Sequence, residues 1–598
     1  MERISLTISK GQRLVNILPS IRTNTILEKT ICGCGATTLE LEAKRNSIIV
    51  EPNIPVIVGK MKTYANVCGV YQGVSSDDIA EYIQNQGEFK KIMTTPEGFS
   101  KIKSAFRKLK INMYKDYFLL FDECEKLVQD IEYRPRIALP INDFFKFENK
   151  AMVSATPIMP SDPRFEEQDF THIKVSPNYN YSEKLFLHQT NNPILLACYT
   201  LNEIKEAGTV CVFFNTIKGI QNIIDKLGIA EFSNIYCGND SALELKEEGL
   251  VNAYSEIETD NQGIAQLNKY NFFTSRFYSA VDIILKEKPI VIIVTESYCY
   301  PYTMVDPKTE AIQIYGRFRN GVAKRMHITN YNYALQVKSR SQLDEFLNGQ
   351  HNVYSQLYEM RFSTVKAGEV HILDQALKSV DYSRFVDDNC NKNFFMYDNA
   401  FAEEHTKGMY KNRADIKIKY GEIDAFDIRY KYIPLSISNM DCIKISNSRL
   451  GQSEINKVLF KILKKVMKGK NKYDKFLLNG MRKNFPKMCH AYEVLGEKGL
   501  VSTNFSTKNI EIAVSKKLAR RRELQEGVVN TIHNHFKENQ WYSTKEINDF
   551  IKETYSNFNL AISNKGCARK IKLYFNAEEM NLRDKRGWKL GHKIVTHF

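Results

Sequence analysis

Short apolar runs alternate with amphipathic segments through roughly the first half of the chain. They predict buried parallel strands separated by helices. The clearest run covers residues 117–121 and ends in the adjacent carboxylates of Asp122 and Glu123. Further strands with polar ends are predicted at residues 46–53, 89–98, 151–157, 208–216 and 289–296. Strands that alternate with helical segments indicate βαβ units, so we expect an α/β fold with parallel sheets.

A glycine-rich turn precedes the helix-forming stretch at residues 39–45. Gly33 and Gly35 permit close backbone approach, and N–H groups at the start of a helix cradle phosphate. Thr37 or Thr38 can offer a hydroxyl to Mg²⁺. Where a P-loop has its phosphate-binding lysine, this chain has Ala36. Taken alone, the stretch is equally consistent with a turn that only starts a helix.

Asp122 and Glu123 are candidates for chemistry because ligands of open α/β sheets bind at the carboxyl ends of strands. An Asp at this edge can hold Mg²⁺, and a neighbouring Glu can orient or deprotonate a water that attacks a phosphate. Further along the chain, Arg317 and Arg319 lie beside Gly316. Two such guanidinium groups suit the negative charge that spreads over a transferring phosphoryl group. A solvated turn is the alternative for either segment alone.

The order of these motifs resembles superfamily 2 (DEAD/DEAH-like) helicases. Gly-x-Gly-x-Thr, the two strand–proline turns, Asp-Glu-Cys-Glu and Ser-Ala-Thr resemble motifs I, Ia, Ib, II and III of that family. Residues 208–216 and 289–296 are similar to motifs IV and V, although the Gly-x-Asp after motif V is not cleanly present. Gln-x-x-Gly-Arg-x-Arg at residues 313–319 resembles motif VI, with its last arginine one position early, as in the viral origin-binding and phage replication branch.

The resemblance covers roughly residues 25–340 and implies two tandem RecA-like domains, at residues 1–175 and 176–345, with ATP and Mg²⁺ bound between them. It implies that Asp122 and Thr37 hold the metal and that Glu123 positions the attacking water. The other implied catalytic residues are Gln313, Arg317 and Arg319. The implied phosphate cradle consists of Gly33, Gly35, Ala36, Thr37 and Thr38. The residues implied to couple the cleft to a nucleic-acid strand, through backbone contacts, are Pro52, Thr95, Ser154, Thr156 and Thr295.

Lys29 lies seven positions before Ala36, and its flexible stem could fold back over the phosphates to supply the missing charge. The alternative is that Lys29 caps the preceding strand in solvent. Ala36 also leaves open a catalytically degenerate, nucleotide-binding scaffold on DNA.

Charge is distributed unevenly over the 598 residues, whose net charge is +15. Residues 441–598 contain 32 Lys and Arg against 15 Asp and Glu, a net charge of +17. The remaining 52 basic and 54 acidic residues nearly cancel. A basic terminal region on a neutral body indicates contact with a polyanion, most often nucleic acid. A basic surface that only aids solubility is the alternative.

The last part of the chain is predicted to be mostly helical. We expect a connecting region at 346–440, which is rich in Asn, Asp and Tyr, and a basic helical region at 441–525 with an apolar stripe over 455–466. Residues 526–598 suggest three helices, at 528–536, from Ser543, and at 564–574, followed by a hairpin at 583–591. This order resembles a winged helix-turn-helix, in which the third helix and the wing contact DNA. The contacts expected there are Lys565, Arg569, Lys570, Lys585 and Arg586. A small capping bundle without a ligand is the alternative.

No apolar run approaches the ~20 residues that a membrane span requires, and the N-terminus lacks a signal-peptide pattern. The twelve cysteines form no C-x-x-C pair, which indicates reduced thiols. We therefore expect a cytoplasmic protein, in a bacterial host if it is phage-encoded. The predicted function is an ATP-dependent DNA helicase or translocase in phage or mobile-element replication, with DNA and replication proteins as partners and no membrane. The degenerate scaffold and an RNA helicase are the alternatives.

Overall fold

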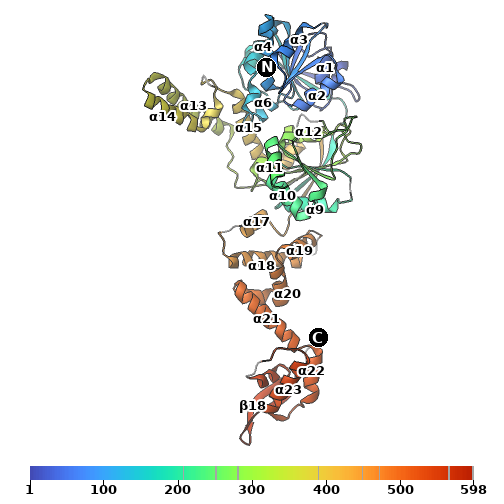
Figure 1. The fold of residues 1–598 in the computed structure, drawn as a ribbon, viewed down its shortest axis with the longest axis vertical. Coiled ribbons are helices and arrows are strands. Elements are labelled where there is room, and N and C mark those ends of the chain that lie inside the picture. Colours follow the sequence, from blue (N-terminus) through green and yellow to red (C-terminus); the bar gives the residue numbers. More distant parts are fainter. Residues whose placement is uncertain are drawn as a thin grey trace. The chain divides into compact units, whose positions relative to one another are not determined.

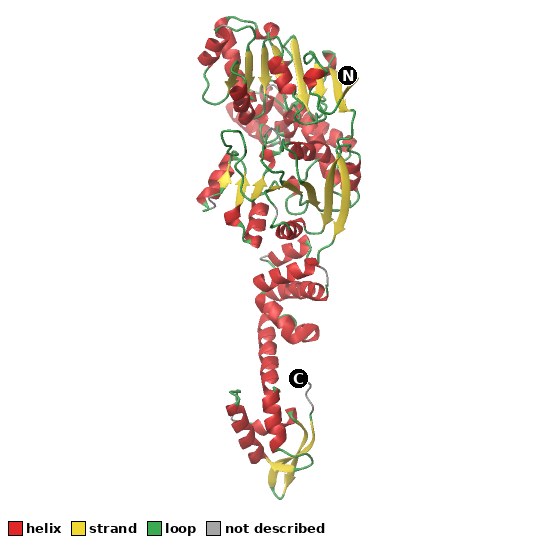
Figure 2. Ribbon diagram, turned by 90° about the vertical axis from the view of Figure 1, so that its right-hand side faces the viewer, coloured by secondary structure: helices red, strands yellow, loops and turns green. Residues whose placement is uncertain are grey.

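The computed structural model describes residues 1–85, 87–206, 208–249, 252–278, 282–387, 390–446, 449–469, 472–562 and 566–594. The chain divides into two compact units, Met1–Leu435 and Ser436–Phe598. The first unit contains two parallel sheets, both flanked by helices (Figure 1). The second unit combines helices with a small antiparallel sheet (Figure 2).

The first sheet has eight described strands, which are all parallel, in the order β1-β8-β2-β7-β6-β3-β5-β4. Their bounds are β1 Glu2–Ile8, β2 Thr25–Glu28, β3 Ser47–Val50, β4 Val67–Val70, β5 Lys91–Thr94, β6 Phe118–Phe121, β7 Asn149–Ser154 and β8 Thr171–Pro177. Every residue of β3, β5 and β6 is buried, because helices cover both faces of a parallel sheet. This confirms the strands predicted from uninterrupted apolar runs.

Helices connect these strands as crossovers. The bounds are α1 Ala36–Glu42, α2 Ile54–Thr63, α3 Ser76–Gln84, α4 Phe99–Leu109, α5 Met113–Asp116, α6 Lys126–Gln129, α7 Ile141–Phe144 and α8 Arg164–Glu167. Lys91 of β5 is buried and its ammonium group donates to the carbonyl oxygens of Glu40 and Ala43, at 2.8 Å each. Those two carbonyls belong to the last turn of α1, so Lys91 fixes the C-terminal end of that helix against the sheet.

The second sheet has eight described strands, which are also all parallel, in the order β12-β11-β13-β10-β14-β15-β9-β16. The strand bounds are β9 Glu183–Thr190, β10 Val210–Phe213, β11 Ser233–Tyr236, β12 Ala253–Tyr254, β13 Tyr270–Phe273, β14 Ile290–Val294, β15 Lys324–Thr329 and β16 Phe426–Ile433. The helices are α9 Pro193–Glu203, α10 Ile217–Leu227, α11 Asn239–Glu247 and α12 Ile312–Gly316. The two sheets with their helices fit the predicted pair of RecA-like domains.

Most of the connecting region predicted at residues 346–440 is built into the first unit, which ends at Leu435. It contains β16, which pairs with β9 at the edge of the second sheet. The helices of this region are α13 Arg340–Ser363, which begins before residue 346, α14 Ala367–Ser379, α15 Phe394–Met409 and α16 Asp415–Gly421. Residues 426–433 alternate apolar and polar positions, as a strand at the edge of a sheet does, but the partner strand lies more than 200 residues earlier in the chain.

Helix α15 joins the two halves of the first unit. Phe395 and Met396, at its start, are buried in the core that includes β6 and α4. Met409, its last residue, is buried in the core of the second sheet. Two polar contacts fix the same ends: Asp398 accepts a hydrogen bond from the backbone N–H of Ser161 (2.9 Å), and Tyr410 donates to the carbonyl of Val305 (2.7 Å). The helix therefore constrains the separation of the two sheets.

The second unit begins with the helices α17 Asn439–Ser446, α18 Gln452–Lys468, α19 Lys472–Asn484, α20 Pro486–Val501 and α21 Thr507–Glu523. Its last part is α22 Glu526–His535, β17 Trp541–Ser543, α23 Thr544–Asn557, the 3-10 helix Cys567–Leu573, β18 Phe575–Leu582 and β19 Lys585–Lys593. The amphipathic helix predicted over 455–466 is α18, and Ser543 caps α23 as predicted. The third predicted helix is a 3-10 helix, and the hairpin is longer than predicted because β18 begins at Phe575.

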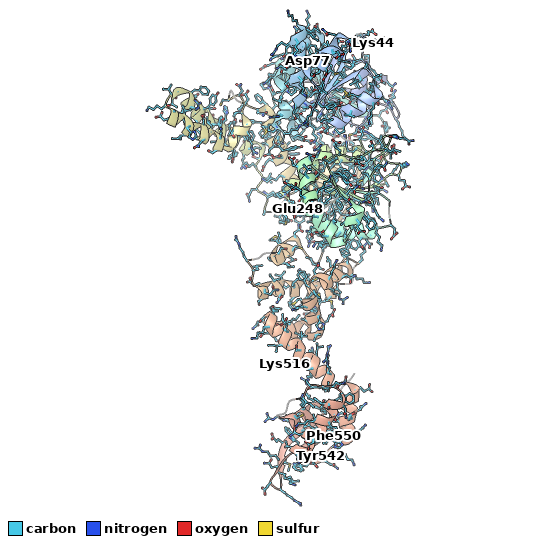
Figure 3. The ribbon with its side chains drawn as sticks, viewed as in Figure 1. Lys44, Asp77, Glu248, Lys516, Tyr542 and Phe550 are labelled. Atoms are coloured by element: carbon cyan, nitrogen blue, oxygen red, sulfur yellow. The ribbon has the colours of Figure 1, made fainter. Side chains whose placement is uncertain are left out.

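The core of the last part of the chain combines aliphatic residues with aromatic rings. Phe536 contacts the rings of Tyr542 and Phe550 at 4.9 and 5.4 Å between centroids, and both partners are labelled in Figure 3. The three strands lie in the order β17-β19-β18, and Arg583 and Asp584 turn β18 into β19 with φ of +48° and +63°. No helix among the described residues is long and apolar enough to cross a bilayer.

Candidate active site

The turn between β2 and α1 is shaped by its two glycines. Gly33 and Gly35 have φ of +79° and +94°, a region that residues with a Cβ rarely adopt. Gly35 is the residue before α1, which begins at Ala36. The backbone therefore presents N–H groups at the start of a helix, at the carboxyl edge of the sheet, where an anion binds favourably.

Thr37 and Asp122, the two predicted metal ligands, are in contact. The Thr37 hydroxyl donates to the Asp122 carboxylate, and Asp122 also accepts the backbone N–H of Glu123 at 2.9 Å. Thr38 points elsewhere, since its hydroxyl accepts a hydrogen bond from Lys60 at 3.2 Å. Hydroxyl and carboxylate oxygens are hard ligands that suit Mg²⁺, which keeps several waters and takes few protein ligands. The residues present fit that ion.

Lys29 lies against the same carboxylates. Its ammonium nitrogen is 3.6 Å from Asp122 and 3.4 Å from Glu123, and the residue is only 6% exposed. Burial disfavours the charged amine, but Glu123 and Asp122 outweigh it and raise the pKa of Lys29 well above its usual value. The alternative placement of Lys29 in solvent is therefore wrong: the buried ammonium group faces the strand end beside the glycine turn.

Glu123 is held by groups from both halves of the unit. Gln313 donates to its carboxylate at 3.4 Å, and a guanidinium nitrogen of Arg317 lies 4.0 Å away. Burial raises the pKa of Glu123, but Lys29 and Arg317 together lower it to about 2. Glu123 is therefore ionised at neutral pH, the state that a group must have to accept a hydrogen bond or a proton from water.

Two further carboxyls lie beside this pair. Burial and the neighbouring Glu123 raise the pKa of Glu125 to about 8, and Gln313 donates to its carboxyl at 3.2 Å. Burial, with the charge of Asp122, also raises the pKa of Glu51 well above its usual value. One oxygen of each has no hydrogen-bond partner among the described residues. Neither residue is indicated by a sequence motif, although β3 pairs with β6 and so brings Glu51 next to Asp122.

Helix α12 of the second half is seated directly on the glycine turn. A Cβ on Gly316 would lie 2.6 Å from the sulfur of Cys32, and one on Gly33 would lie 2.7 Å from the Arg319 guanidinium. Arg317 is almost fully buried and donates to the Gln313 side chain at 2.6 Å. Arg319 is partly exposed and pairs with Asp282. The structure thus brings together the predicted Gln313, Arg317 and Arg319 with the predicted phosphate cradle.

Residues Ser154 and Thr156 link the strand end to α12. The Ser154 hydroxyl accepts the Thr156 N–H at 2.9 Å, and Gln313 donates to the Thr156 hydroxyl at 3.2 Å. Gln313 therefore contacts Glu123, Glu125 and Thr156 at once, so a shift of α12 would change the hydrogen bonds of all three residues.

The residues predicted to couple the cleft to nucleic acid through backbone contacts have buried side chains. Thr95 caps a short 3-10 turn by accepting the N–H of Gly98, and Thr295 donates to the carbonyl of Thr303. Pro52 is also buried, and its carbonyl accepts from Arg134 at 2.8 Å. These side chains are therefore structural, because the threonine hydroxyls form hydrogen bonds with backbone groups of the turns that follow the strands. Their backbone groups are engaged as well, because Thr95 donates to the Val70 carbonyl at 3.2 Å, Thr295 donates to the Ile328 carbonyl at 2.9 Å, and proline has no N–H.

In the second unit, Arg569, Lys585 and Arg586 are exposed. Lys570 is paired with Glu523, the last residue of α21, so its charge is already balanced. Lys565 lies outside the described residues.

No protein-family model and no curated protein matches this chain. Among solved structures the chain is similar to S. cerevisiae Dbp5 bound to RNA and ADP BeF3, at 13% identity over 59% of this chain and 89% of that one, with a TM-score of 0.33. It is also similar to T4 UvsW, at 10% identity over 69% and 74%, with a TM-score of 0.20. RecG bound to a three-way DNA junction matches at 11% identity over 64% and 48%, with a TM-score of 0.31. Likeness at these values says nothing about what this chain does.

Proposed function

We propose that the chain is an ATP-dependent DNA translocase or helicase that hydrolyses ATP between its two parallel-sheet halves. The observation that carries the proposal is the surroundings of Asp122 and Glu123. Thr37 and Lys29 approach this pair from the glycine turn, and Gln313 and Arg317 approach it from the other half of the unit. Such a site is complete only when the two halves are in contact. Hydrolysis would therefore be coupled to movement of one half relative to the other.

Asp122 and Thr37 would hold Mg²⁺, which neutralises charge on the phosphate oxygens when bound. The ionised Glu123 carboxylate orients the attacking water and accepts its proton. Arg319 lies against Gly33 and offers its guanidinium to the phosphate in the glycine turn. The buried Arg317 holds Gln313 and adds positive charge beside Glu123.

Lys29 supplies the positive charge that Ala36 does not. Its ammonium group lies beside the glycine turn and between the carboxylates of Asp122 and Glu123. Mg²⁺ held by Asp122 would balance the charge of that carboxylate, and the Lys29 ammonium group would then be available to face the phosphates.

Ala36 is also the one observation that favours a second candidate, a scaffold that binds nucleotide without turning it over. In that case Lys29 serves only to balance the charge of two buried carboxylates. The intact set of ionised Glu123, Gln313 and Arg317 favours hydrolysis instead.

DNA is proposed as the polynucleotide because the second unit carries the basic excess of the chain. Its last part has the order helix, strand, helix, 3-10 helix and hairpin, with the third strand between the other two, which fits a winged helix. Arg569 and the hairpin residues Lys585 and Arg586 would contact phosphate there. The early position of Arg319 favours a place in phage or mobile-element replication, in the cytoplasm of a bacterial host and with replication proteins as partners.

Removal of the second unit tests its part in DNA binding. We expect the fragment Met1–Leu435, which keeps β16, to bind duplex DNA about tenfold more weakly than the full chain and with a flatter dependence on salt, because fewer counterions are released. Fluorescence anisotropy over a salt series measures both quantities. Equal affinity and an equal salt slope for the fragment and the full chain would contradict a DNA-binding second unit.

The choice of polynucleotide is tested by adding single-stranded DNA, duplex DNA or RNA to the full chain during ATP hydrolysis. We expect DNA to stimulate turnover. Stimulation by RNA alone would make the protein an RNA helicase, and nucleotide binding without turnover would make it a scaffold.

A further inference from the structure

The loop that follows β14 is held rigid by a buried carboxylate. Glu296 accepts hydrogen bonds from the backbone N–H of Tyr298 (3.0 Å) and of Cys299 (2.6 Å), and from the side-chain amide of Asn330 (2.8 Å). Thr303 closes the loop by donating to the Tyr300 carbonyl at 2.7 Å. The backbone of residues 296–303 is therefore fixed from the inside, while its tyrosine side chains point outward.

Tyrosines gather at this edge of the second sheet. Tyr298 is 37% exposed, and Tyr302 and Tyr333 are both 61% exposed. Tyr333 contacts Tyr331, which follows β15, with 4.9 Å between ring centroids. Burial and the neighbouring Tyr331 and Tyr333 raise the pKa of Tyr298. Tyr300 and Tyr302 have ring centroids 6.2 Å apart. Large exposed rings in one place are unusual on a surface that only faces water.

Positive charge lies beside these rings. The Arg413 guanidinium stacks 3.7 Å from the ring centroid of Tyr432, near the end of β16, and Lys417 lies 5.1 Å from the ring centroid of Tyr430. Arg413 is exposed, and its charge also acts on Tyr331. The Glu296 carboxylate, the nearest acidic group in the loop, is buried and engaged by three donors. The surface therefore combines aromatic faces with cations.

The tyrosines lie at the carboxyl edge of the second sheet. Because β14, β15 and β16 are parallel members of one sheet, their carboxyl ends lie at one edge. Asn215, which follows β10 at the same edge, donates to the Tyr302 carbonyl at 3.2 Å. The loops that carry these tyrosines thus lie at the same edge of the second sheet as the turns that follow its other strands.

We propose that Tyr298, Tyr302, Tyr331, Tyr333 and Tyr432, the tyrosine platform, stack on the bases of single-stranded DNA, while Arg413 and Lys417 contact its phosphates. Every base has an aromatic face, so such stacking grips a strand without reading its sequence. Stacking on the guanidinium plane of Arg413 adds to the same grip. This inference rests on the proposed function for the choice of DNA. It adds a place at which the strand is held by its bases and not only by its backbone.

The test compares two probes of equal charge, an oligothymidylate of about 20 nucleotides and a deoxyribose-phosphate strand of the same length without bases. Full-length wild type should bind the probe with bases about tenfold more tightly or better. The double variant Tyr298→Ala/Tyr333→Ala should lose most of that preference and keep its affinity for the base-free strand. Tyr298→Phe/Tyr333→Phe should keep the preference, because stacking needs the ring and not the hydroxyl.

Phe232→Ala is the matched control, since Phe232 is 55% exposed but precedes β11 and so lies at the opposite edge of the sheet. It should bind both probes as wild type does. Thermal melting of each variant shows whether it is folded. Equal affinity of wild type for the two probes, or an unchanged preference in the folded alanine variant, overturns the proposal. So does a base preference that holds for oligouridylate and not for oligothymidylate. Binding is measured without ATP, so the two proposals can fail separately. A wild type that prefers the probe with bases but does not hydrolyse ATP would support the tyrosine platform and contradict only the proposed function.

Discussion

Replacement of Glu123 by glutamine lowers the rate of ATP hydrolysis by about 10³-fold, within the range expected when a general base is lost. The carboxylate has a pKa of about 2 because Lys29 and Arg317 lie beside it, so it is ionised and able to take a proton at neutral pH. An amide of the same shape keeps the contact with Gln313 but cannot accept a proton. Binding of ATP should change little, since Asp122, Thr37 and the glycine turn remain.

Glu125→Gln is the matched control for this variant. The pKa of Glu125 is about 8, so its carboxyl is largely protonated at neutral pH, and a glutamine amide replaces a neutral group of similar size. We expect hydrolysis close to that of wild type. Turnover and nucleotide affinity are measured separately, by phosphate release and by calorimetry. A Glu123→Gln enzyme as fast as wild type would show that another group positions the water.

Replacement of Lys29 by alanine lowers turnover by about 10²-fold, because loss of a preorganised positive charge near a transferring phosphoryl group costs several kcal/mol. Two buried carboxylates, Asp122 and Glu123, also lose their partner. Part of the effect will therefore appear as lower stability, and the thermal midpoint must be followed beside the rate.

The double variant Lys29→Ala/Ala36→Lys separates the two effects. A lysine at position 36, the first residue of α1, restores a charge from the other side of the glycine turn, so we expect part of the lost turnover to return. Structural damage alone would not be repaired in this way. A folded Lys29→Ala enzyme that turns over ATP as wild type does would remove Lys29 from the catalytic account.

The parts of the fold that were predictable are those with a strong local pattern. Residues 117–121 are fully apolar because β6 is covered on both faces, and the polar residues that follow mark its carboxyl end. Thr216, an N-cap, and Gly228, in the left-handed conformation after α10, bound that helix as such residues commonly do. The register between neighbouring strands then brings the candidate site residues together at one edge of the sheet. Their spacing in the sequence alone shows only the order in which they occur.

The remaining features depend on contacts between distant segments. β16 alternates apolar and charged residues but joins the sheet only through β9, and no local sequence pattern indicates that partner. The helical phase of α1 decides that Thr37 and not Thr38 faces Asp122, and this phase follows from the point at which the helix begins. Thr95 and Thr295 lie at strand ends as predicted, but the turns that they stabilise bury their side chains.

We expect ATP hydrolysis at the Asp122–Glu123 site to depend on DNA. The most direct measurement is phosphate release by the full-length protein with Mg²⁺ and ATP, in the presence and absence of single-stranded DNA, with Glu123→Gln as the blank. We expect turnover that rises when DNA is added and that falls to background in the variant. Turnover in wild type no greater than in Glu123→Gln, with or without DNA, would contradict it.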